Sequence, residues 1–256
     1  RELFIRWMQF GTFSPVFRAH GAMSSREPWI HGEETTRIIK KYIQLRYRLM
    51  PYIYSSAFQT YKEGLPIMRP MLLEHPDDPH ELVNDRLTQY YFGDYLLVAP
   101  VTSPLNEAED MEIYLPEGEW YEFESLKRTD SGLKKQSLTI ESIPVYVKGG
   151  AIIPMNENDR SVILLAPSTK SMQSKFTWYH DDGISNQYKK GIFEAIDIYL
   201  SNQEIVFNNV KNVRPIRLKI LKAAIKNPRF KTKSLHSGPF YLIDTILKPG
   251  RTKIRF

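Results

Sequence analysis

The clearest periodic pattern in the chain lies over residues 33–63, where apolar side chains recur every three to four positions. This spacing places them on one face of a long amphipathic helix. Acidic residues mark the start of the helix, and Gly64 marks its end. Pro51 lacks a backbone donor, so we expect it to kink or interrupt that helix. Residues 2–13 show a similar spacing and predict a shorter helix before it.

Short apolar runs beside these helices predict buried strands over residues 14–18 and 66–73. A further amphipathic segment over residues 86–92 predicts a third helix. Alternation of helix and strand is typical of a parallel α/β fold. Two strands do not form a stable parallel sheet alone, because both faces and both edges need cover. Residues 1–92 therefore read as an incomplete part of a larger parallel α/β domain.

After Gly93 the pattern changes to short alternating runs separated by turn residues, which is typical of antiparallel β-structure. A Gly-Gly pair at 149–150 between two apolar runs predicts a hairpin. The spacing of the runs predicts two antiparallel β-sandwich domains in series. We place the proximal sandwich at residues 93–158 and the distal sandwich at residues 159–256.

Basic residues exceed acidic ones and give a net charge of +6 at pH 7. Much of the excess lies late in the chain, at Lys211, Arg214, Arg217, Lys219, Lys222, Lys226, Arg229, Lys231 and Lys233. Several of these alternate with apolar residues, which is typical of the solvent face of a strand. No zinc-finger, phosphate-loop or RNA-binding motif accompanies them, so we expect no nucleic-acid partner.

The composition indicates a protein with a packed core and without cysteine-based sites or membrane spans. At 42% hydrophobic residues, the chain is able to bury a substantial core. It contains no cysteine, which excludes disulfides and thiolate metal ligands. No apolar run reaches the roughly 18 residues of a membrane span, so we expect no membrane association.

His20 is the strongest single candidate for chemistry. It follows the predicted strand at 14–18 and precedes Gly21, so its imidazole is expected at the carboxyl end of that strand. In parallel α/β barrels this end forms the active face. Arg18 lies two residues earlier and is a weaker candidate for the same site. A lone histidine is also compatible with a purely structural role.

The segment around these residues resembles a known family. Residues 6–15 read R-W-M-Q-F-G-T-F-S-P, and Arg18-Ala19-His20 follows. This order resembles glycoside hydrolase family 31, the retaining α-glucosidases and α-xylosidases. Further stretches that resemble the family lie at residues 26–29, 46–54, 66–70, 97–101, 114–116, 120–121, 149–154 and 179–183.

The resemblance implies that residues 1–92 supply the last two βα units of a (β/α)8 TIM barrel, followed by the two sandwiches. It implies that His20 and Arg18 bind substrate, an oligosaccharide with terminal α-linked glucose or xylose. The family's nucleophile and acid/base motifs do not occur in the sequence. We therefore expect a C-terminal portion of the enzyme, inactive alone, whose partner is the missing N-terminal part. No cofactor is implied.

Other acidic and aromatic residues allow competing interpretations. A pair of carboxylates or a metal site is conceivable at His75, Asp77, Asp78, His80 and Glu81, but a solvated loop is the simpler reading. Residues 181–183, Asp-Asp-Gly, read as a turn. Trp29 and Trp120 read as core residues rather than sugar platforms. The rival function is a non-catalytic module that binds carbohydrate or supports assembly.

Overall fold

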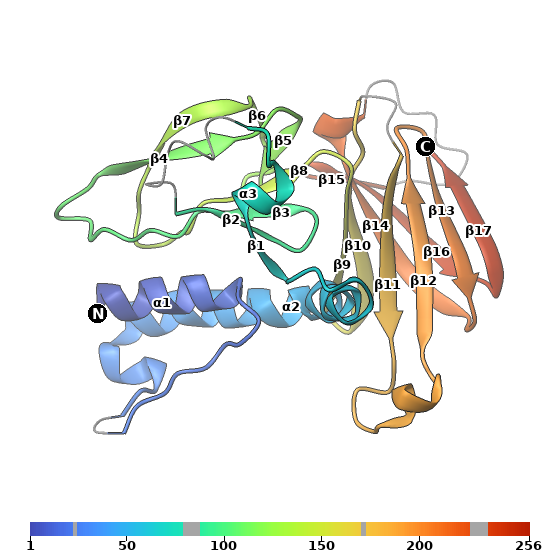
Figure 1. Ribbon diagram of the computed structural model, residues 1–256, viewed down its shortest axis with the longest axis horizontal. Helices are drawn as coiled ribbons and strands as arrows, with labels where there is room; N and C mark the ends of the chain where they lie inside the picture. Colours follow the sequence, from blue (N-terminus) through green and yellow to red (C-terminus); the bar gives the residue numbers. More distant parts are fainter. Residues whose placement is uncertain (23–24, 79–87, 170–172, 226–234) are drawn as a thin grey trace.

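In the computed structural model (Figure 1), two helices and a layer of short strands lie beside two sheets of longer strands. The structure describes residues 1–22, 25–78, 88–169, 173–225 and 235–256. The helices are α1 (Glu2–Thr12), η1 (Pro28–His31), α2 (Glu33–Glu63), α3 (Met71–Glu74), η2 (Gln187–Lys190) and η3 (Lys222–Ala224). The first two predicted helices are therefore confirmed.

Helix α2 continues through Pro51, so the expected interruption is absent. The helix does change direction along its length: in Figure 1 its first part runs across the view and its last part is seen end-on, which agrees with the expected kink. A proline inside a helix costs roughly 3 kcal/mol. Next to it, the side chains of Leu49 and Tyr52 are fully buried and Ile53 is 6% exposed. Burial of three such side chains contributes about 1.5–3 kcal/mol each, which outweighs the loss of one backbone hydrogen bond. Tertiary packing therefore keeps the helix intact.

The first predicted strand is absent. Residues 16–20 have no regular structure, so the strand expected over 14–18 is wrong. A parallel strand needs neighbours to accept and donate its backbone hydrogen bonds. Within the described ranges no strand pairs with this segment. It is held instead by a side chain of α2, described below with the site.

The second predicted strand forms only in part and pairs differently from the expectation. It is β1 (Met68–Pro70), which is antiparallel to β2 (Tyr90–Phe92). The helix expected over 86–92 is therefore wrong at residues 90–92, and its first two residues lie outside the described ones. Three consecutive aromatic side chains, all buried, suit an extended strand that is covered on both faces. The described chain thus does not form two parallel βα units.

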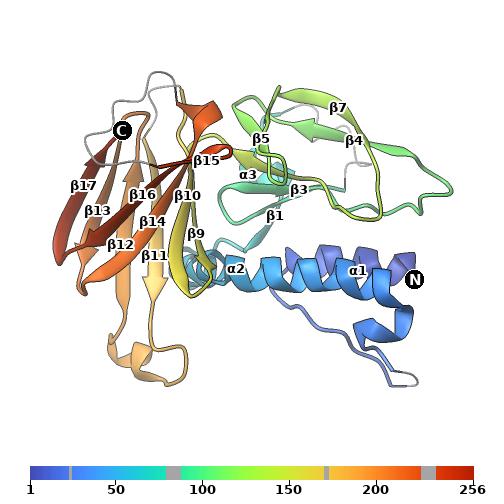
Figure 2. The ribbon, with the colours of Figure 1, turned by 180° about the vertical axis from the view of Figure 1, so that it is seen from behind.

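The described residues form four sheets, one of which contains β1 and β2 (Figures 1 and 2). A six-stranded sheet, in the order β1-β2-β3-β8-β5-β6, lies above α1 and α2 in Figure 1, next to the two-stranded sheet β4-β7. Their remaining strands are β3 (Leu96–Val98), β4 (Asp110–Leu115), β5 (Trp120–Glu122), β6 (Arg128–Thr129), β7 (Gly132–Ser137) and β8 (Val145–Lys148).

The later part of the chain forms a five-stranded sheet, β15-β16-β14-β10-β9, and a four-stranded sheet, β11-β12-β13-β17. Their strands are β9 (Ala151–Glu157), β10 (Arg160–Ala166), β11 (Ser174–His180), β12 (Glu194–Leu200), β13 (Glu204–Val210), β14 (Arg214–Leu221), β15 (Leu235–Ser237), β16 (Phe240–Leu247) and β17 (Gly250–Arg255). One pair, β10 and β14, is parallel, so the expectation of purely antiparallel pairing is wrong there.

The largest apolar core is continuous from helices α1 and α2 to the six-stranded, five-stranded and four-stranded sheets. It contains buried residues of α1, α2, β3, β9, β12 and β14, among them Ile5, Tyr52, Val98, Ile152 and Ile198. Helix α2 itself contacts β9 and β11. Strand pairing also crosses both of the domain boundaries expected from the sequence. β2 pairs with β3 across residue 92, and β9 pairs with β10 across residue 158. The division into three domains stays a prediction.

The Gly-Gly hairpin is also wrong. Strand β8 pairs with β3 and β5, whereas β9 pairs with β10, so residues 149–150 carry the chain from one sheet to another. Gly149 donates its N–H to the Glu119 carbonyl oxygen, and Gly150 donates to that of Ala166. Gly150 has φ +89°, and a Cβ on Gly149 would lie 2.8 Å from the Glu119 Cβ. Glycines are therefore needed for a close crossing between sheets.

The predicted alternation of charged and apolar residues late in the chain is confirmed in β14. Its charged side chains are paired rather than simply solvated. Arg217 binds Asp244 on β16 with two contacts of 2.6 Å, and Lys219 lies 2.5 Å from Glu157 on β9. Residues 226–234, which carry the later basic residues, lie outside the described part of the chain.

A largely buried polar cluster joins the five-stranded sheet to the four-stranded sheet. Arg214 on β14 lies 3.0 Å from Glu194 on β12 and 3.4 Å from Nδ1 of His180 on β11. Burial, together with the Arg214 charge, lowers the pKa of His180 to about 4. The imidazole is therefore neutral in the folded protein near neutral pH.

The low pKa of His180 predicts acid-sensitive stability. The unfolded chain takes up this proton near pH 6.5 and the folded chain only near pH 4, so stability is lost as the pH falls between these values. We expect about 2 kcal/mol to be lost between pH 7 and pH 4.5 from this group. Urea unfolding at both values measures it. His180→Gln should remove most of that difference, and an unchanged difference would contradict the assignment.

Candidate functional site

Both residues singled out from the sequence line one hollow next to α1. The hollow has a volume of about 380 Å³. It is lined by Phe4, Trp7, Met8, Phe10, Gly11, Ser14, Val16, Phe17, Arg18, Ala19, His20 and Arg26. Its wall is therefore one side of α1 together with the segment that follows it. Aromatic rings beside charged and imidazole groups form a surface of the kind that binds polar organic ligands.

Within this hollow, Arg18 and His20 are in direct contact. The Arg18 Nη2 lies 2.7 Å from the His20 Nδ1, and both side chains are exposed. Because arginine has donors only, it donates and Nδ1 accepts. The remaining proton of the neutral ring is then on Nε2. His20 is thereby prepared to donate a hydrogen bond from Nε2 to a ligand oxygen.

The sequence did not reveal the residue that holds this segment in place. Arg46 of α2 is only 8% exposed. Its guanidinium donates at 2.6–3.2 Å to the carbonyl oxygens of Gly11 and Thr12 at the end of α1 and of Ser14 and Pro15 in the segment that follows. It also lies 5.5 Å from the ring of Phe17. The only signal in the sequence was an arginine on the face of the helix that is otherwise apolar.

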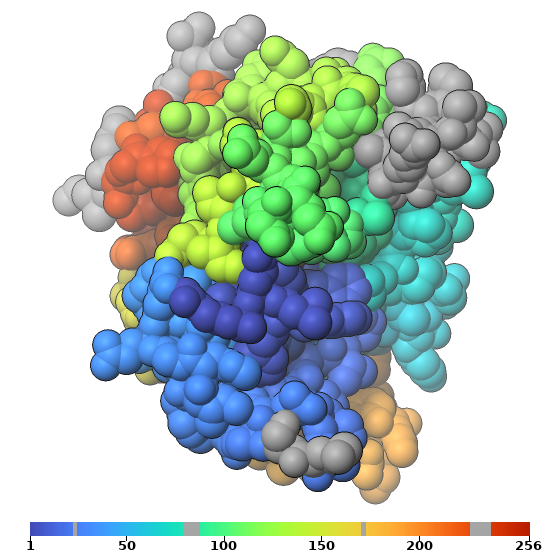
Figure 3. Space-filling view, turned by 90° about the vertical axis from the view of Figure 1, so that its left-hand side faces the viewer, coloured from blue at the N-terminus to red at the C-terminus, as the bar shows by residue number. Residues whose placement is uncertain are grey.

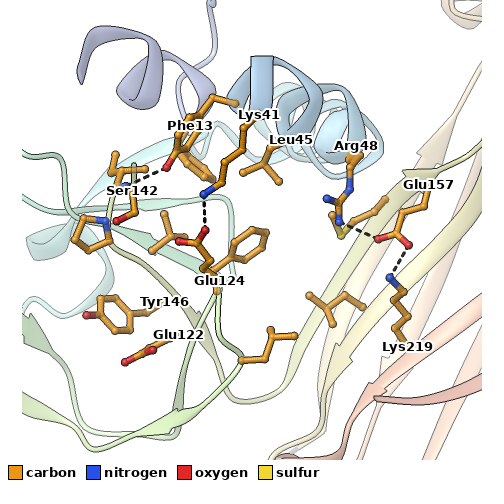
Figure 4. Close-up of a pocket in the computed structure, with 18 of the residues that line it drawn as sticks. Phe13, Lys41, Leu45, Arg48, Glu122, Glu124, Ser142, Tyr146, Glu157 and Lys219 are labelled. Atoms are coloured by element: carbon orange, nitrogen blue, oxygen red, sulfur yellow. Dashed lines mark hydrogen bonds and ion pairs between the residues drawn. The ribbon is translucent and has the colours of Figure 1, made fainter. Parts of the chain in front are cut away.

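A second hollow, of about 390 Å³, lies between α2, the six-stranded sheet and the five-stranded sheet (Figure 4). All of its charged side chains except Glu122 are paired across the junction. Lys41 binds Glu124, while Arg48 and Lys219 reach Glu157 from opposite sides at 2.9 and 2.5 Å. Pairs of this kind join the elements around the hollow and leave it electrically balanced. We assign it no chemistry.

The acidic loop after β1 is tied to the neighbouring sheets rather than simply solvated. His75 Nε2 lies 2.7 Å from the hydroxyl of Tyr91, and Asp78 accepts a hydrogen bond from the hydroxyl of Tyr114 at 2.5 Å. Asp77 is exposed as expected. His80 and Glu81 lie outside the described residues. In the part of the chain that the structure describes, no group of three or more His, Asp or Glu residues suits a metal ion.

The interpretation of residues 181–183 as a turn is confirmed. Asp181 accepts from the Gly183 N–H at 2.8 Å, and Asp182 accepts from the Ser185 N–H at 2.9 Å.

The two tryptophans that were expected in the core differ in burial. Trp120 is fully buried as expected, but Trp29 is 68% exposed, so its assignment to the core is wrong. It lies on η1, a 3₁₀ helix of four residues in which no side chain is buried.

Comparison with known proteins identifies two domains of one family in the chain. The family model of the glycosyl hydrolases family 31 TIM-barrel domain matches residues 1–56. That of the glycosyl hydrolase family 31 C-terminal domain matches residues 64–153. An α-xylosidase of Saccharolobus solfataricus is 37% identical over 231 residues, which are 86% of this chain and 31% of that protein. Human neutral α-glucosidase C is 36% identical over 73% of this chain and 22% of its own length.

Solved structures agree with these matches. A family 31 dextranase of Flavobacterium johnsoniae, in complex with isomaltotriose, superimposes with a TM-score of 0.85 at 29% identity. The match covers 99% of this chain and 37% of the dextranase. A family 31 α-xylosidase of Xanthomonas citri gives a TM-score of 0.80 at 30% identity, over 99% of this chain and 29% of its own.

The chain is thus the end of a TIM-barrel domain followed by a β-rich C-terminal domain. It belongs to glycoside hydrolase family 31 and corresponds to the C-terminal portion of the α-glucosidases and α-xylosidases of that family. It spans between about a fifth and a third of the curated relatives described above. Among its described helices, none combines the length and the apolar composition that a bilayer crossing requires.

Proposed function

We propose that this chain is part of a retaining α-glycosidase that releases terminal α-linked glucose or xylose from oligosaccharides. The observation that carries the proposal is the Arg18–His20 pair in the hollow next to α1, inside the stretch that matches the family's barrel domain. With its Nδ1 engaged by Arg18, His20 donates from Nε2 to a hydroxyl of the sugar. Arg18 sets the orientation of that ring.

The chain supplies binding groups rather than the reacting carboxylates. Retaining glycosidases use two carboxyl groups about 5–5.5 Å apart, one as nucleophile and one as acid/base. No acidic residue is among those that line the hollow with His20. We infer that both reacting carboxylates come from the N-terminal part of the same enzyme. The substrate and that part are the partners of this chain, and the reaction needs no cofactor.

The isolated chain is therefore expected to be inactive. Incubation of the purified 256 residues with p-nitrophenyl α-glucoside and α-xyloside should release no nitrophenol above the buffer blank. A complete enzyme that contains the same 256 residues serves as the positive control. Robust turnover by the isolated chain would overturn the assignment of the carboxylates, whereas sugar binding without turnover by the complete enzyme would favour a non-catalytic module.

A further inference from the structure

A surface groove of about 670 Å³ lies between helix α2 and the turn that joins β9 to β10. Gln44, Tyr47 and Arg48 line it from α2, where a spacing of three and four residues places them on one face of the helix. Asn158 lines it from the turn. Helix α2 contacts β9, and Figure 2 shows the end of that strand beside the helix. We call this feature the α2–β9 groove.

The charged groups of the α2–β9 groove are already paired. Arg48 and Lys219 both bind Glu157, and Lys41 binds Glu124 in the adjoining hollow shown in Figure 4. A charged ligand would meet a like charge beside each opposite one, which is unfavourable. Among the described residues that line the groove, Glu157 supplies the one carboxylate, so the carboxylate pair of a retaining glycosidase is absent there. The groove thus suits an uncharged ligand, and binding rather than hydrolysis.

The rim of the groove carries polar groups that are free to bind a ligand. The side chains of Gln44, Tyr47 and Asn158 are exposed, and none of the three makes a hydrogen bond within the described ranges. Asn158 and Asp159 have φ of +48° and +59° and form the two-residue turn of the β9–β10 hairpin, which fixes the position of Asn158. Two amides and a phenol offer both donors and acceptors. The ring of Tyr47, a residue that is 69% exposed, offers an apolar face.

We propose that the α2–β9 groove is a second, non-catalytic binding site, and that its ligand is a neutral α-linked oligosaccharide. A sugar unit has an apolar C–H face for the Tyr47 ring and hydroxyl groups for the amides of Gln44 and Asn158. The α-linkage of the ligand rests on the proposed function. Helix α1, which forms a wall of the His20 hollow, lies at the centre of the face shown in Figure 3 (dark blue). No described residue lines both that hollow and the groove, so the two sites are separate.

The test is affinity electrophoresis of a complete enzyme that contains the same 256 residues, in native gels with increasing soluble starch. We expect starch to retard the wild type. Tyr47→Ala should weaken the apparent affinity at least about 5-fold, because it removes the aromatic face of the site. Tyr47→Phe keeps the ring and should retain most of the affinity. Tyr61→Ala is the matched control, since Tyr61 is 82% exposed on the same helix but does not line the groove.

Hydrolysis of p-nitrophenyl α-glucoside and α-xyloside reads out the proposed function separately. Tyr47→Ala should leave kcat/KM for these small substrates unchanged, whereas His20→Ala should lower it and keep the retardation by starch. No retardation of the wild type, or an equal loss in Tyr47→Ala and Tyr61→Ala, overturns the second site. Retardation that His20→Ala abolishes and Tyr47→Ala keeps would place the binding in the hollow and overturn it too. An enzyme that starch retards through Tyr47 but that cleaves neither substrate would support the groove and contradict the proposed function.

Discussion

Replacing His20 with alanine in the complete enzyme is expected to lower kcat/KM by roughly 30- to 1,000-fold, equivalent to about 2–4 kcal/mol of transition-state stabilisation. The reason is the tautomer that Arg18 imposes on the ring, which leaves the Nε2 proton for the sugar. An alanine removes that donor and lets water into the site. Steady-state kinetics with p-nitrophenyl α-glucoside and α-xyloside measure the effect.

The matched control is His31→Ala. His31 packs against Phe4 at 4.6 Å between ring centroids but is not among the residues that line the hollow with His20. Its replacement should therefore leave kcat/KM within a few-fold of the wild type. Arg18→Ala should fall between the two, because His20 then keeps its donor but loses its orientation. Unchanged kcat/KM in the His20→Ala enzyme would remove His20 from the substrate site.

Replacing Arg46 with methionine is expected to destabilise the chain by about 3–5 kcal/mol. Methionine fills similar space but removes this donor from the carbonyl oxygens of Thr12, Ser14 and Pro15, whereas that of Gly11 keeps its hydrogen bond from the Ser14 hydroxyl. A buried acceptor that loses its partner costs about 1–3 kcal/mol, and relaxation of the segment toward water recovers part of that sum. Urea unfolding of the 256-residue chain gives the difference in the free energy of unfolding.

Arg48→Met provides the control from the same helix. The Arg48 side chain is 48% exposed and pairs with Glu157, which keeps its contact with Lys219. A surface pair of this kind contributes about 0–1 kcal/mol. If Arg46→Met destabilised the chain no more than Arg48→Met, the four contacts of Arg46 would not hold the segment. Faster amide exchange over residues 11–20 in Arg46→Met alone would show that the loss is local to the site.

The features that depend on neighbours along the chain were predictable from the sequence. The two helices over residues 2–12 and 33–63, the alternation in β14 and the turn at residues 181–183 follow from spacing and turn chemistry within a few residues. The resemblance to glycoside hydrolase family 31 also followed from short ordered motifs, and the family matches confirm it. His20 and, more weakly, Arg18 were singled out from the same motifs, and the structure shows that their side chains are in contact.

Strand pairing and anchoring depended on partners far away in the sequence. An apolar run over residues 14–18 reads like a strand, but no described strand pairs with it, and Arg46 binds the carbonyl groups of Ser14 and Pro15 from 32 and 31 residues away. The Gly149-Gly150 pair reads like a hairpin, yet the partner of β9 is β10 and not β8. Local pattern determined which residues become helical or extended and which side they bury. Only the tertiary structure decided which partner each backbone group hydrogen-bonds to and which surface each apolar face packs against. Those contacts are set by packing between elements and not by sequence spacing.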